Sequence, residues 1–323
     1  MSPADLGLFA LNASRAYGLK IAEHLGIPLS EHEEREFDDG EHKARPLHDV
    51  RGKHVFVVQS LYSDDHQSVN DKLCRLLFFI ATLKDAGAAR TAAVIPYLCY
   101  ARKDRKTQPR DPTTSRYVAQ LLEAAGADRV LTLDAHNLAA YHNAFRCPTE
   151  HLEAKDLFVE YLAPRVAGQP VTVLSPDLGG IKRAERFRQA LNERLSEPAA
   201  AGFMEKARSL GKVTGGTLVG EVAGRTVIIV DDLISTGTTI ARAVEACRRQ
   251  GALRAYAAAA HGLFVGGASA VASEPFLEKI VVTDTVPPFR LPADVSRAKL
   301  AVVDAAALFA KVIERLHRAT ACG

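Results

Sequence analysis

The chain has 323 residues, of which 47% are hydrophobic and 24% charged, which is typical of a folded globular protein large enough for two domains. Its formal net charge of +3 is too small to predict a nucleic-acid-binding surface, and no apolar run reaches the roughly 20 residues that span a membrane. Five scattered cysteines with no CxxC pair argue against a disulfide framework and a zinc site. Since the N-terminus also lacks a signal-peptide pattern, we expect a cytoplasmic protein with reduced cysteines.

The N-terminal segment predicts a short strand, a helix and then a charged stretch. The strand covers residues 9–12, and the helix covers residues 15–25 and ends at Gly26. Residues 31–41 are mostly charged, and their composition alone predicts a solvated segment. Phe37 is the exception there, because it is aromatic and carboxylates follow it closely.

A βαβ unit is predicted between residues 54 and 95. A buried-type strand at 54–59 precedes a polar loop at 60–67, and a second strand at 91–95 ends before Pro96. Between them, apolar residues recur at helical spacing and predict an amphipathic helix that Gly87 ends: Leu73, Leu76, Leu77, Ile80 and Leu83.

The segment after this unit is basic. Residues 97–112 contain five Lys or Arg side chains, Arg110 included, and residues 107–112 predict an exposed loop. Such a cluster would suit a polyphosphate ligand, with a solvated charged loop as the alternative.

Two further strands end in polar residues suited to ligand binding. Residues 130–133 lead to Asp134 and His136, and residues 171–174 lead to Asp177 and a Gly-Gly turn. Because parallel strands end at the same edge of a sheet, these side chains could converge with the acid pair described below. A linker near residue 150 is expected to separate domains at 1–150 and 151–323, with a last helix at about 304–318 packing back on the first domain.

The clearest motif is a run of β-branched residues at 227–230 that leads into Asp231 and Asp232. An unbroken apolar run predicts a strand buried on both faces, and its carboxyl end is where open α/β sheets bind ligands. The hydroxyl-rich loop at 235–239 holds one glycine and precedes a helix at 239–249, which supplies what a phosphate group needs. Since the two acids suit vicinal hydroxyls or a metal, the stretch predicts a site for a phosphorylated sugar. A plain strand–helix connection is the alternative.

The second half of the chain repeats the pattern of the first. After the helix at 239–249, Gly251 precedes a strand at 255–260, and the phrases KDAGAARTAAVIPY and RRQGALRAYAAAAHG are alike in design. This likeness predicts two α/β domains with mainly parallel sheets, built on one plan. Chance likeness between two strand–helix units is the competing explanation.

Taken in order, the motifs resemble the ribose-phosphate pyrophosphokinase (phosphoribosyl pyrophosphate synthetase) family over nearly the whole chain. The matching phrases are FDDGE, VRGKHVFVVQS, VIPYLCYARKDRK, AGADRVLTLDAH, VLSPDLGGIKRA, EKAR, GRTVIIVDDLISTGTT and VVTDTVP. The resemblance implies two tandem phosphoribosyltransferase-like domains. It also implies an enzyme that uses Mg²⁺ to transfer the pyrophosphoryl group of ATP to the anomeric hydroxyl of ribose 5-phosphate. A homo-oligomer is expected, with no nucleic-acid or membrane partner.

The same resemblance implies a role for particular residues. It implies catalytic roles for two residues of a mobile loop, Lys206 and Arg208. It implies ATP contacts, with the aromatic ring stacked on adenine, from Phe37, Asp39, Gly40, Glu41, Arg102 and Lys103. It implies that ribose 5-phosphate is held by Arg208, Asp231, Asp232, Ser235, Thr236, Gly237, Thr238 and Thr239. It implies a magnesium site at His136, Asp177 and Asp134, although a histidine is unusual for this ion and contact through water is the alternative.

Some positions depart from the family pattern. Ser235 stands where the family commonly has Asp, Lys103 replaces a usual Gln, and residues 137–142 differ from a segment used in bacterial hexamers. The resemblance therefore leaves hexamer formation and control by phosphate and ADP open. The rival interpretations are a phosphoribosyltransferase with the same sugar site and a non-catalytic regulatory homologue.

Overall fold

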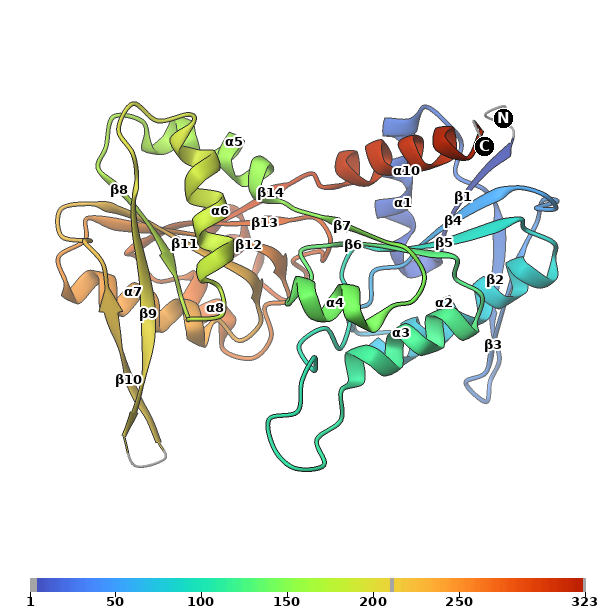
Figure 1. Cartoon of the computed structure of the whole chain (residues 1–323), viewed down its shortest axis with the longest axis horizontal. Coiled ribbons are helices and arrows are strands. Elements are labelled where there is room, and N and C mark those ends of the chain that lie inside the picture. The colour runs from blue at the N-terminus through green and yellow to red at the C-terminus, as the bar shows by residue number, and fades with distance from the viewer. Residues whose placement is uncertain (1–4, 210–211, 322–323) are drawn as a thin grey trace. The chain divides into compact units, whose positions relative to one another are not determined.

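The computed structural model describes residues 5–209 and 212–321, without the side chains of residues 206–216 and 320–321. The chain forms two compact units, unit 1 with Met1–Leu152 and Ala305–Gly323, and unit 2 with Glu153–Asp304 (Figure 1). Within the described residues, no helix has the length and apolar character needed to cross a membrane. The cysteines in this part of the chain, Cys74, Cys99, Cys147 and Cys247, are free thiols.

Unit 1 is built on a parallel sheet in the order β1-β4-β5-β6-β7. Its strands are β1 (Leu6–Ala10), β4 (His54–Val58), β5 (Arg90–Ile95), β6 (Arg129–Leu133) and β7 (Thr149–Leu152). The strand β4 is buried along its whole length, as a run of apolar residues covered on both faces should be. Residues 149–152, placed at a linker by sequence, therefore form the last strand of this sheet.

Helices cover both faces of this sheet. They are α1 (Arg15–Leu25), α2 (Val69–Asp85), α3 (Thr114–Ala124), α4 (Leu138–Ala144) and α10 (Ala306–Ala321). The predicted stop at Gly26 is confirmed, since this residue has a φ of 66° and caps α1 in the left-handed region. Helix α10, drawn in red, packs on α1, and the rings of Tyr17 and Phe309 meet edge to face at 6.0 Å (Figure 1).

A separate two-stranded hairpin lies between α1 and β4. It consists of β2 (His32–Glu36) and β3 (His42–Pro46), where the sequence predicted a solvated segment. The segment is largely exposed, as predicted, but it pairs as a hairpin and is anchored to α2. Arg75 of that helix lies 2.6 Å from Glu36 and 3.8 Å from Glu34, and the side chains of Arg75 and Glu34 are about 95% buried.

Unit 2 is built on a larger sheet in the order β10-β9-β8-β11-β12-β13-β14. Its strands are β8 (Val171–Ser175), β9 (Ala200–Ser209), β10 (Lys212–Val219), β11 (Thr226–Ile234), β12 (Arg254–Gly262), β13 (Leu277–Thr283) and β14 (Leu300–Val303). All neighbours are parallel except β10, which returns antiparallel to β9. Its helices are α5 (Lys155–Val166), α6 (Ile181–Asn192), α7 (Thr238–Arg249), α8 (Ala268–Ala272) and α9 (Ala293–Lys299).

The strand β11 is longer than its sequence predicts. It continues past Val230 through both acids to Ile234, because Asp231, Leu233 and Ile234 pair with residues of β12. The alternation of half-buried and buried residues in this extension is that of a strand rather than a loop. The acid pair is therefore held by a sheet, and the loop of the motif begins only at Ser235.

The two units repeat one order of elements, which confirms the predicted duplication of plan. Each has a strand, a helix, a hairpin, a strand and then three helix–strand pairs, so that β2–β3 corresponds to β9–β10, and β4–α2 to β11–α7. Each sheet is followed by a helix that packs in the other unit. Helix α5 follows β7 and packs on α6, whereas α10 follows β14 and packs on α1.

Candidate functional site

The connection from β11 to α7 in unit 2 forms a tight turn at the carboxyl edge of the sheet. Gly237 precedes α7 with a φ of 76°, in the left-handed region that favours glycine. An added Cβ at this position would lie 3.0 Å from Cγ2 of Val271. The backbone conformation therefore favours glycine here, and any larger residue would force Val271 to shift.

Hydroxyl groups surround this turn. Thr236, Thr238 and Thr239 are exposed, and the hydroxyls of Thr236 and Thr238 lie 3.0 Å apart. Behind the turn, the N–H of Val265 donates to the carbonyl of Ser235 at 3.0 Å and fixes the loop on the sheet. A helix N-terminus beside a fixed group of hydroxyls is a binding site suited to a phosphate group.

The acid pair lies next to this turn. The side chain of Asp232 is 8% exposed and that of Asp231 16% exposed, and Oδ1 of Asp231 accepts the backbone N–H of Asp232 at 2.8 Å. Burial, followed by the neighbouring Asp232 carboxylate, raises the pKa of Asp231 well above its usual range. Such buried acceptors are suited to hydroxyl donors, which relieve the cost of burying a carboxylate.

Arg183, to which the sequence analysis gave no role, also belongs to this site. It stands in the first turn of α6, and its Nη1 lies 3.2 Å from Oδ1 of Asp232 and 3.6 Å from Oδ1 of Asp231. Only the position of this arginine three residues after the Gly-Gly turn could have suggested it from sequence.

The Gly-Gly turn itself is shaped around Asp177. Oδ1 of Asp177 accepts the N–H of Gly180 at 2.9 Å, and the Ser175 hydroxyl donates to the Asp177 carbonyl at 2.6 Å. An added Cβ on Gly180 would lie 2.7 Å from that hydroxyl oxygen. Asp177 is thus fixed at the end of β8, beside the start of α6.

The residues implied in catalysis lie on a hairpin. Lys206 and Arg208 are in β9, opposite Gly216 and Val213 of β10, where a mobile loop was expected. Their side chains lie outside the part of the chain that the structure describes.

In unit 1, the basic segment after β5 forms a pocket of about 130 Å³. Its lining residues come from this segment and from the end of β6: Arg102, Lys103, Asp104, Arg105, Thr107, Asp111, Pro112 and His136. The structure thereby brings three residues predicted by sequence, Arg102, Lys103 and His136, to one place. A pocket lined by several cations is suited to a polyphosphate.

Internal hydrogen bonds shape the basic segment. Oδ2 of Asp111 accepts the hydroxyl of Thr107 at 2.6 Å and its N–H at 3.0 Å, and the hydroxyl bond is the main reason that the pKa of Asp111 is lowered. Asn137 ties the segment to α4. Its side chain accepts the N–H of Ala140 at the start of that helix and donates to Asp104 at 2.8 Å.

The turn before His136 has an unusual backbone. Asp134 has a φ of 41°, and the next N–H, that of Ala135, donates to Nε2 of His151 at 3.1 Å. Among the described residues, no three His, Cys, Asp or Glu side chains form a group that could hold a metal alone. Magnesium on a nucleotide takes most of its ligands from phosphates and water, so a sparse protein contribution fits it.

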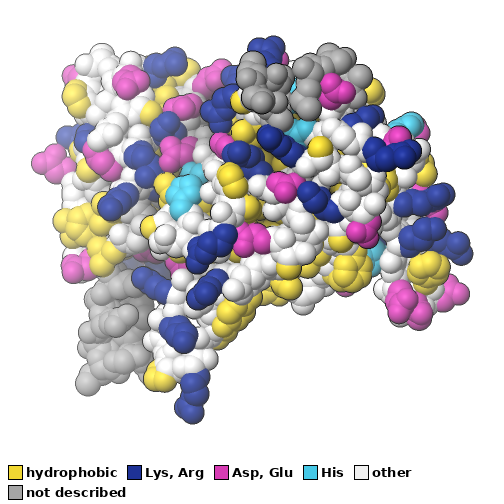
Figure 2. All heavy atoms as spheres, turned by 45° about the vertical axis from the view of Figure 1, so that its right-hand side comes forward, with side chains coloured by type: hydrophobic (Ala, Val, Ile, Leu, Met, Phe, Trp, Pro, Cys, Tyr) yellow, Lys and Arg dark blue, Asp and Glu magenta, His cyan; other side chains and the backbone are white. Residues whose placement is uncertain are grey.

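The remaining ATP residues predicted from sequence lie at the tip of the β2–β3 hairpin. Phe37 is 39% exposed, its N–H donates to the Glu41 carbonyl at 2.8 Å, and Gly40 turns the chain with a φ of 87°. The guanidinium of Arg35 lies 5.1 Å from the centre of the Phe37 ring. In Figure 2, acidic side chains gather at this tip. An exposed ring with carboxylates beside it can stack on a base and accept from its amino group.

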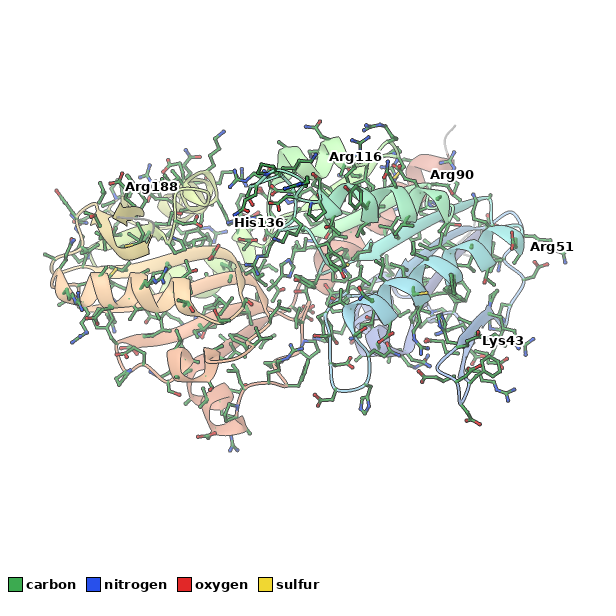
Figure 3. All side chains as sticks on the ribbon, turned by 90° about the horizontal axis from the view of Figure 1, so that it is seen from below. Lys43, Arg51, Arg90, Arg116, His136 and Arg188 are labelled. Carbon is green, nitrogen blue, oxygen red and sulfur yellow. The ribbon has the colours of Figure 1, made fainter. Side chains whose placement is uncertain are left out.

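The hairpin tip and the basic pocket lie in different parts of unit 1. The hairpin is far from the segment after β5 in Figure 1, and Figure 3 shows Lys43 of β3 well apart from His136. Within one chain, the structure therefore does not bring the predicted adenine contacts to the predicted phosphate contacts.

The fold and these sites define a class of protein. Two tandem units with parallel sheets, one of which carries an acid pair and a hydroxyl-rich anion loop, are typical of phosphoribosyltransferase-like proteins. Residues 6–126 match the family model for the N-terminal domain of ribose phosphate pyrophosphokinase, and residues 204–323 match that for the phosphoribosyl synthetase-associated domain.

Full-length relatives agree with these matches. The chain is 39% identical over 314 residues to a ribose-phosphate pyrophosphokinase of Caldanaerobacter subterraneus, covering 97% of this chain and 95% of the relative. It is 36% identical over 321 residues to ribose-phosphate pyrophosphokinase 1 of Streptococcus pneumoniae, covering 98% of this chain and 95% of that relative. The crystal structure of phosphoribosylpyrophosphate synthetase from Mycobacterium smegmatis superposes with a TM-score of 0.88 at 33% identity. The match covers 97% of this chain and 99% of that chain. The chain belongs to the ribose-phosphate pyrophosphokinase family.

Proposed function

We propose that this protein is a ribose-phosphate diphosphokinase. It transfers the β,γ-pyrophosphoryl group of ATP to the anomeric hydroxyl of ribose 5-phosphate, forming phosphoribosyl pyrophosphate and releasing AMP. The P–O bond between the α- and β-phosphates breaks, a new bond forms from the β-phosphorus to the anomeric oxygen, and that oxygen loses its proton. Family membership supports the reaction, and the geometry of the two sites supports the substrates.

One observation carries the acceptor half of this proposal. The acid pair Asp231–Asp232 and the hydroxyl-rich turn of Ser235–Thr239 stand next to each other at the edge of one sheet. The turn would hold the 5-phosphate at the N-terminus of α7, while the acids would accept hydrogen bonds from the ribose hydroxyls. A sugar that carries both groups uses both parts of the site at once.

The nucleotide half rests on the basic pocket of unit 1. Arg102 and Lys103 would contact the phosphates of ATP, and His136 of the same pocket would hold Mg²⁺ directly or through water. Asp134 of unit 1 and Asp177 of unit 2 are the other two residues that the family resemblance implies for this ion. When bound, the ion neutralises phosphate charge and helps to orient the phosphates.

Catalysis then depends on positioning and on charge. Lys206 and Arg208 would stabilise the charge that grows on the transferred group and on AMP as it leaves, and Arg208 would also contact ribose 5-phosphate. No covalent intermediate with the protein is needed, because a phosphoryl-type transfer leaves little covalent work for side chains.

The separation of the two ATP regions supports a homo-oligomer. Since the hairpin tip with Phe37, Asp39, Gly40 and Glu41 lies apart from the basic pocket in one chain, adenine would stack on the hairpin of a second copy. The native mass with and without ATP tests this, because a monomer with full ATP affinity would contradict a shared site. We also propose a cytoplasmic location, as the sequence predicts.

The function is tested by incubating the protein with ribose 5-phosphate and Mg-ATP while separating the nucleotides by chromatography. We expect AMP and phosphoribosyl pyrophosphate in equal amounts, and inorganic phosphate added in series shows whether it activates. An absence of AMP would favour a regulatory homologue. Consumption of phosphoribosyl pyrophosphate with a free base would favour a phosphoribosyltransferase instead.

A further inference from the structure

Arg183 contacts both acids of the ribose site through one nitrogen. Its Nη1 is 3.2 Å from Oδ1 of Asp232 and 3.6 Å from Oδ1 of Asp231, and its side chain is 18% exposed. A guanidinium is planar, always charged and rich in donors, so that it can hold two carboxylates in a fixed mutual orientation. The contact therefore affects both the charge and the geometry of the acid pair.

The acid pair needs such a counter-charge. Two largely buried carboxylates on adjacent residues repel each other, and burial makes ionisation of both costly. The raised pKa of Asp231 reflects this cost, and the guanidinium of Arg183 opposes it. A cation at this place keeps the pair ready to accept from sugar hydroxyls before any substrate arrives.

The position of Arg183 in its helix is unfavourable unless the acids compensate for it. It lies in the first turn of α6, which contains no acidic residue, and a cation at a helix N-terminus is opposed by the helix dipole. The guanidinium lies beside the neighbouring Gly-Gly turn, since an added Cβ on Gly180 would be 3.7 Å from Nη1, an ordinary contact distance. Local helix preference thus gives no reason for an arginine here, whereas the acid pair does.

We propose that Arg183 is a positioning residue for ribose recognition, the resident counter-ion that holds Asp231 and Asp232 in their binding geometry without a divalent metal. This inference rests on the proposed function, because it concerns the same sugar site. It predicts that ribose 5-phosphate binds in the absence of magnesium. It also predicts that a free divalent cation can partly replace the guanidinium once the arginine is removed.

The experiment is calorimetric titration of the full-length protein with ribose 5-phosphate, in EDTA and then in Mg²⁺. In EDTA the wild type binds, Arg183→Gln loses about tenfold or more in affinity, and Arg183→Lys falls between them. Mg²⁺ reduces the difference in ribose 5-phosphate affinity between Arg183→Gln and the wild type. The matched control is Lys182→Gln, which removes the same charge from an exposed neighbouring residue and leaves the affinity unchanged.

Three results would overturn the inference. The first is that Arg183→Gln and the wild type bind ribose 5-phosphate with equal affinity in EDTA. The second is that Mg²⁺ does not reduce the difference in affinity between them. The third is that Lys182→Gln loses as much affinity as Arg183→Gln. A variant that misfolds shows an altered circular dichroism spectrum, and the test then rests on Arg183→Lys, whose affinity in EDTA must fall below that of the wild type. If the wild type itself binds no ribose 5-phosphate, the proposed sugar site fails rather than the role of Arg183.

Discussion

The loops after β4 and β11 occupy the same place in the two units, but only one is open to a ligand. In unit 2, the loop after β11 presents exposed threonines at the start of α7. In unit 1, the loop after β4 carries Asp64, whose carboxylate accepts the N–H groups of His66 at 2.9 Å and Gln67 at 2.8 Å. The anion that unit 2 would take from its substrate is supplied in unit 1 by the chain itself.

A buried lysine completes the closed loop of unit 1. Nζ of Lys72 lies 2.5 Å from Asp64 and 3.7 Å from the centre of the Tyr62 ring, and its side chain is fully buried. Burial alone would raise the pKa of Asp64, but the bond from Lys72 and the backbone N–H groups lower it below its usual range. The same order of elements therefore gives a loop closed by an internal ion pair in unit 1 and a loop open to a ligand in unit 2.

The corresponding hairpins differ in a similar way. The hairpin β9–β10 joins the main sheet of unit 2 and carries Lys206, whereas β2–β3 forms its own small sheet in unit 1 and carries Phe37. We therefore expect changes on the first hairpin to affect turnover and changes on the second to affect nucleotide binding.

The substitution Lys206→Ala should have the largest effect. We expect kcat to fall by about 100-fold or more, because this cation would stabilise charge that develops only in the transition state. The affinity for ribose 5-phosphate should stay within about twofold, as measured by calorimetry. An equal loss of sugar affinity would show that Lys206 acts in binding and not in the transfer step.

The substitution Asp64→Asn should destabilise unit 1 by about 3 kcal/mol, because it leaves a buried ammonium without its carboxylate. Urea unfolding measures this change, and the sugar affinity of unit 2 should not alter. The double variant Asp64→Asn with Lys72→Met should recover part of the loss. If the single variant is as stable as the wild type, the loop of unit 1 is not held together by this ion pair.

The substitution Gly237→Ala should weaken ribose 5-phosphate binding by about 10- to 50-fold, since an added Cβ strains the turn and meets Val271. The matched control is Gly224→Ala. Gly224 has a similar φ of 68° but has nothing within 4 Å of an added Cβ, so it measures backbone strain alone. Equal binding by both variants would mean that the space beside Val271 is irrelevant to the phosphate site.

The substitution Phe37→Leu should have the smallest effect. It removes stacking on the base but keeps an apolar side chain, and stacking contributes about 1 kcal/mol. We expect KM for ATP to rise about fivefold while KM for ribose 5-phosphate is unchanged. Initial-rate kinetics with each substrate varied in turn distinguishes this outcome from a general loss of activity.

The sequence predicted those features that depend on local pattern. The buried run at 227–230 and the helical spacing of α2 led to the correct elements, because strand and helix periods appear directly in sequence. The pairing of β2 with β3 was not predicted, since a charged composition does not show it and the anchoring partner Arg75 lies 39 positions from Glu36. Arg183 was not predicted either, because its ion-pair partners Asp231 and Asp232 are distant in sequence and are brought close only by the fold.

The exchange of end helices has a consequence for the order of synthesis. Helix α10 follows the whole of unit 2 in the sequence, yet residues such as Phe309 and Ile313 are fully buried in unit 1. The strands of unit 1 are made first and must wait, with the surface beneath α10 uncovered, until the whole of unit 2 has been translated. Nascent chains of this protein therefore carry an exposed apolar face while unit 2 is being translated, which is where chaperones would bind them.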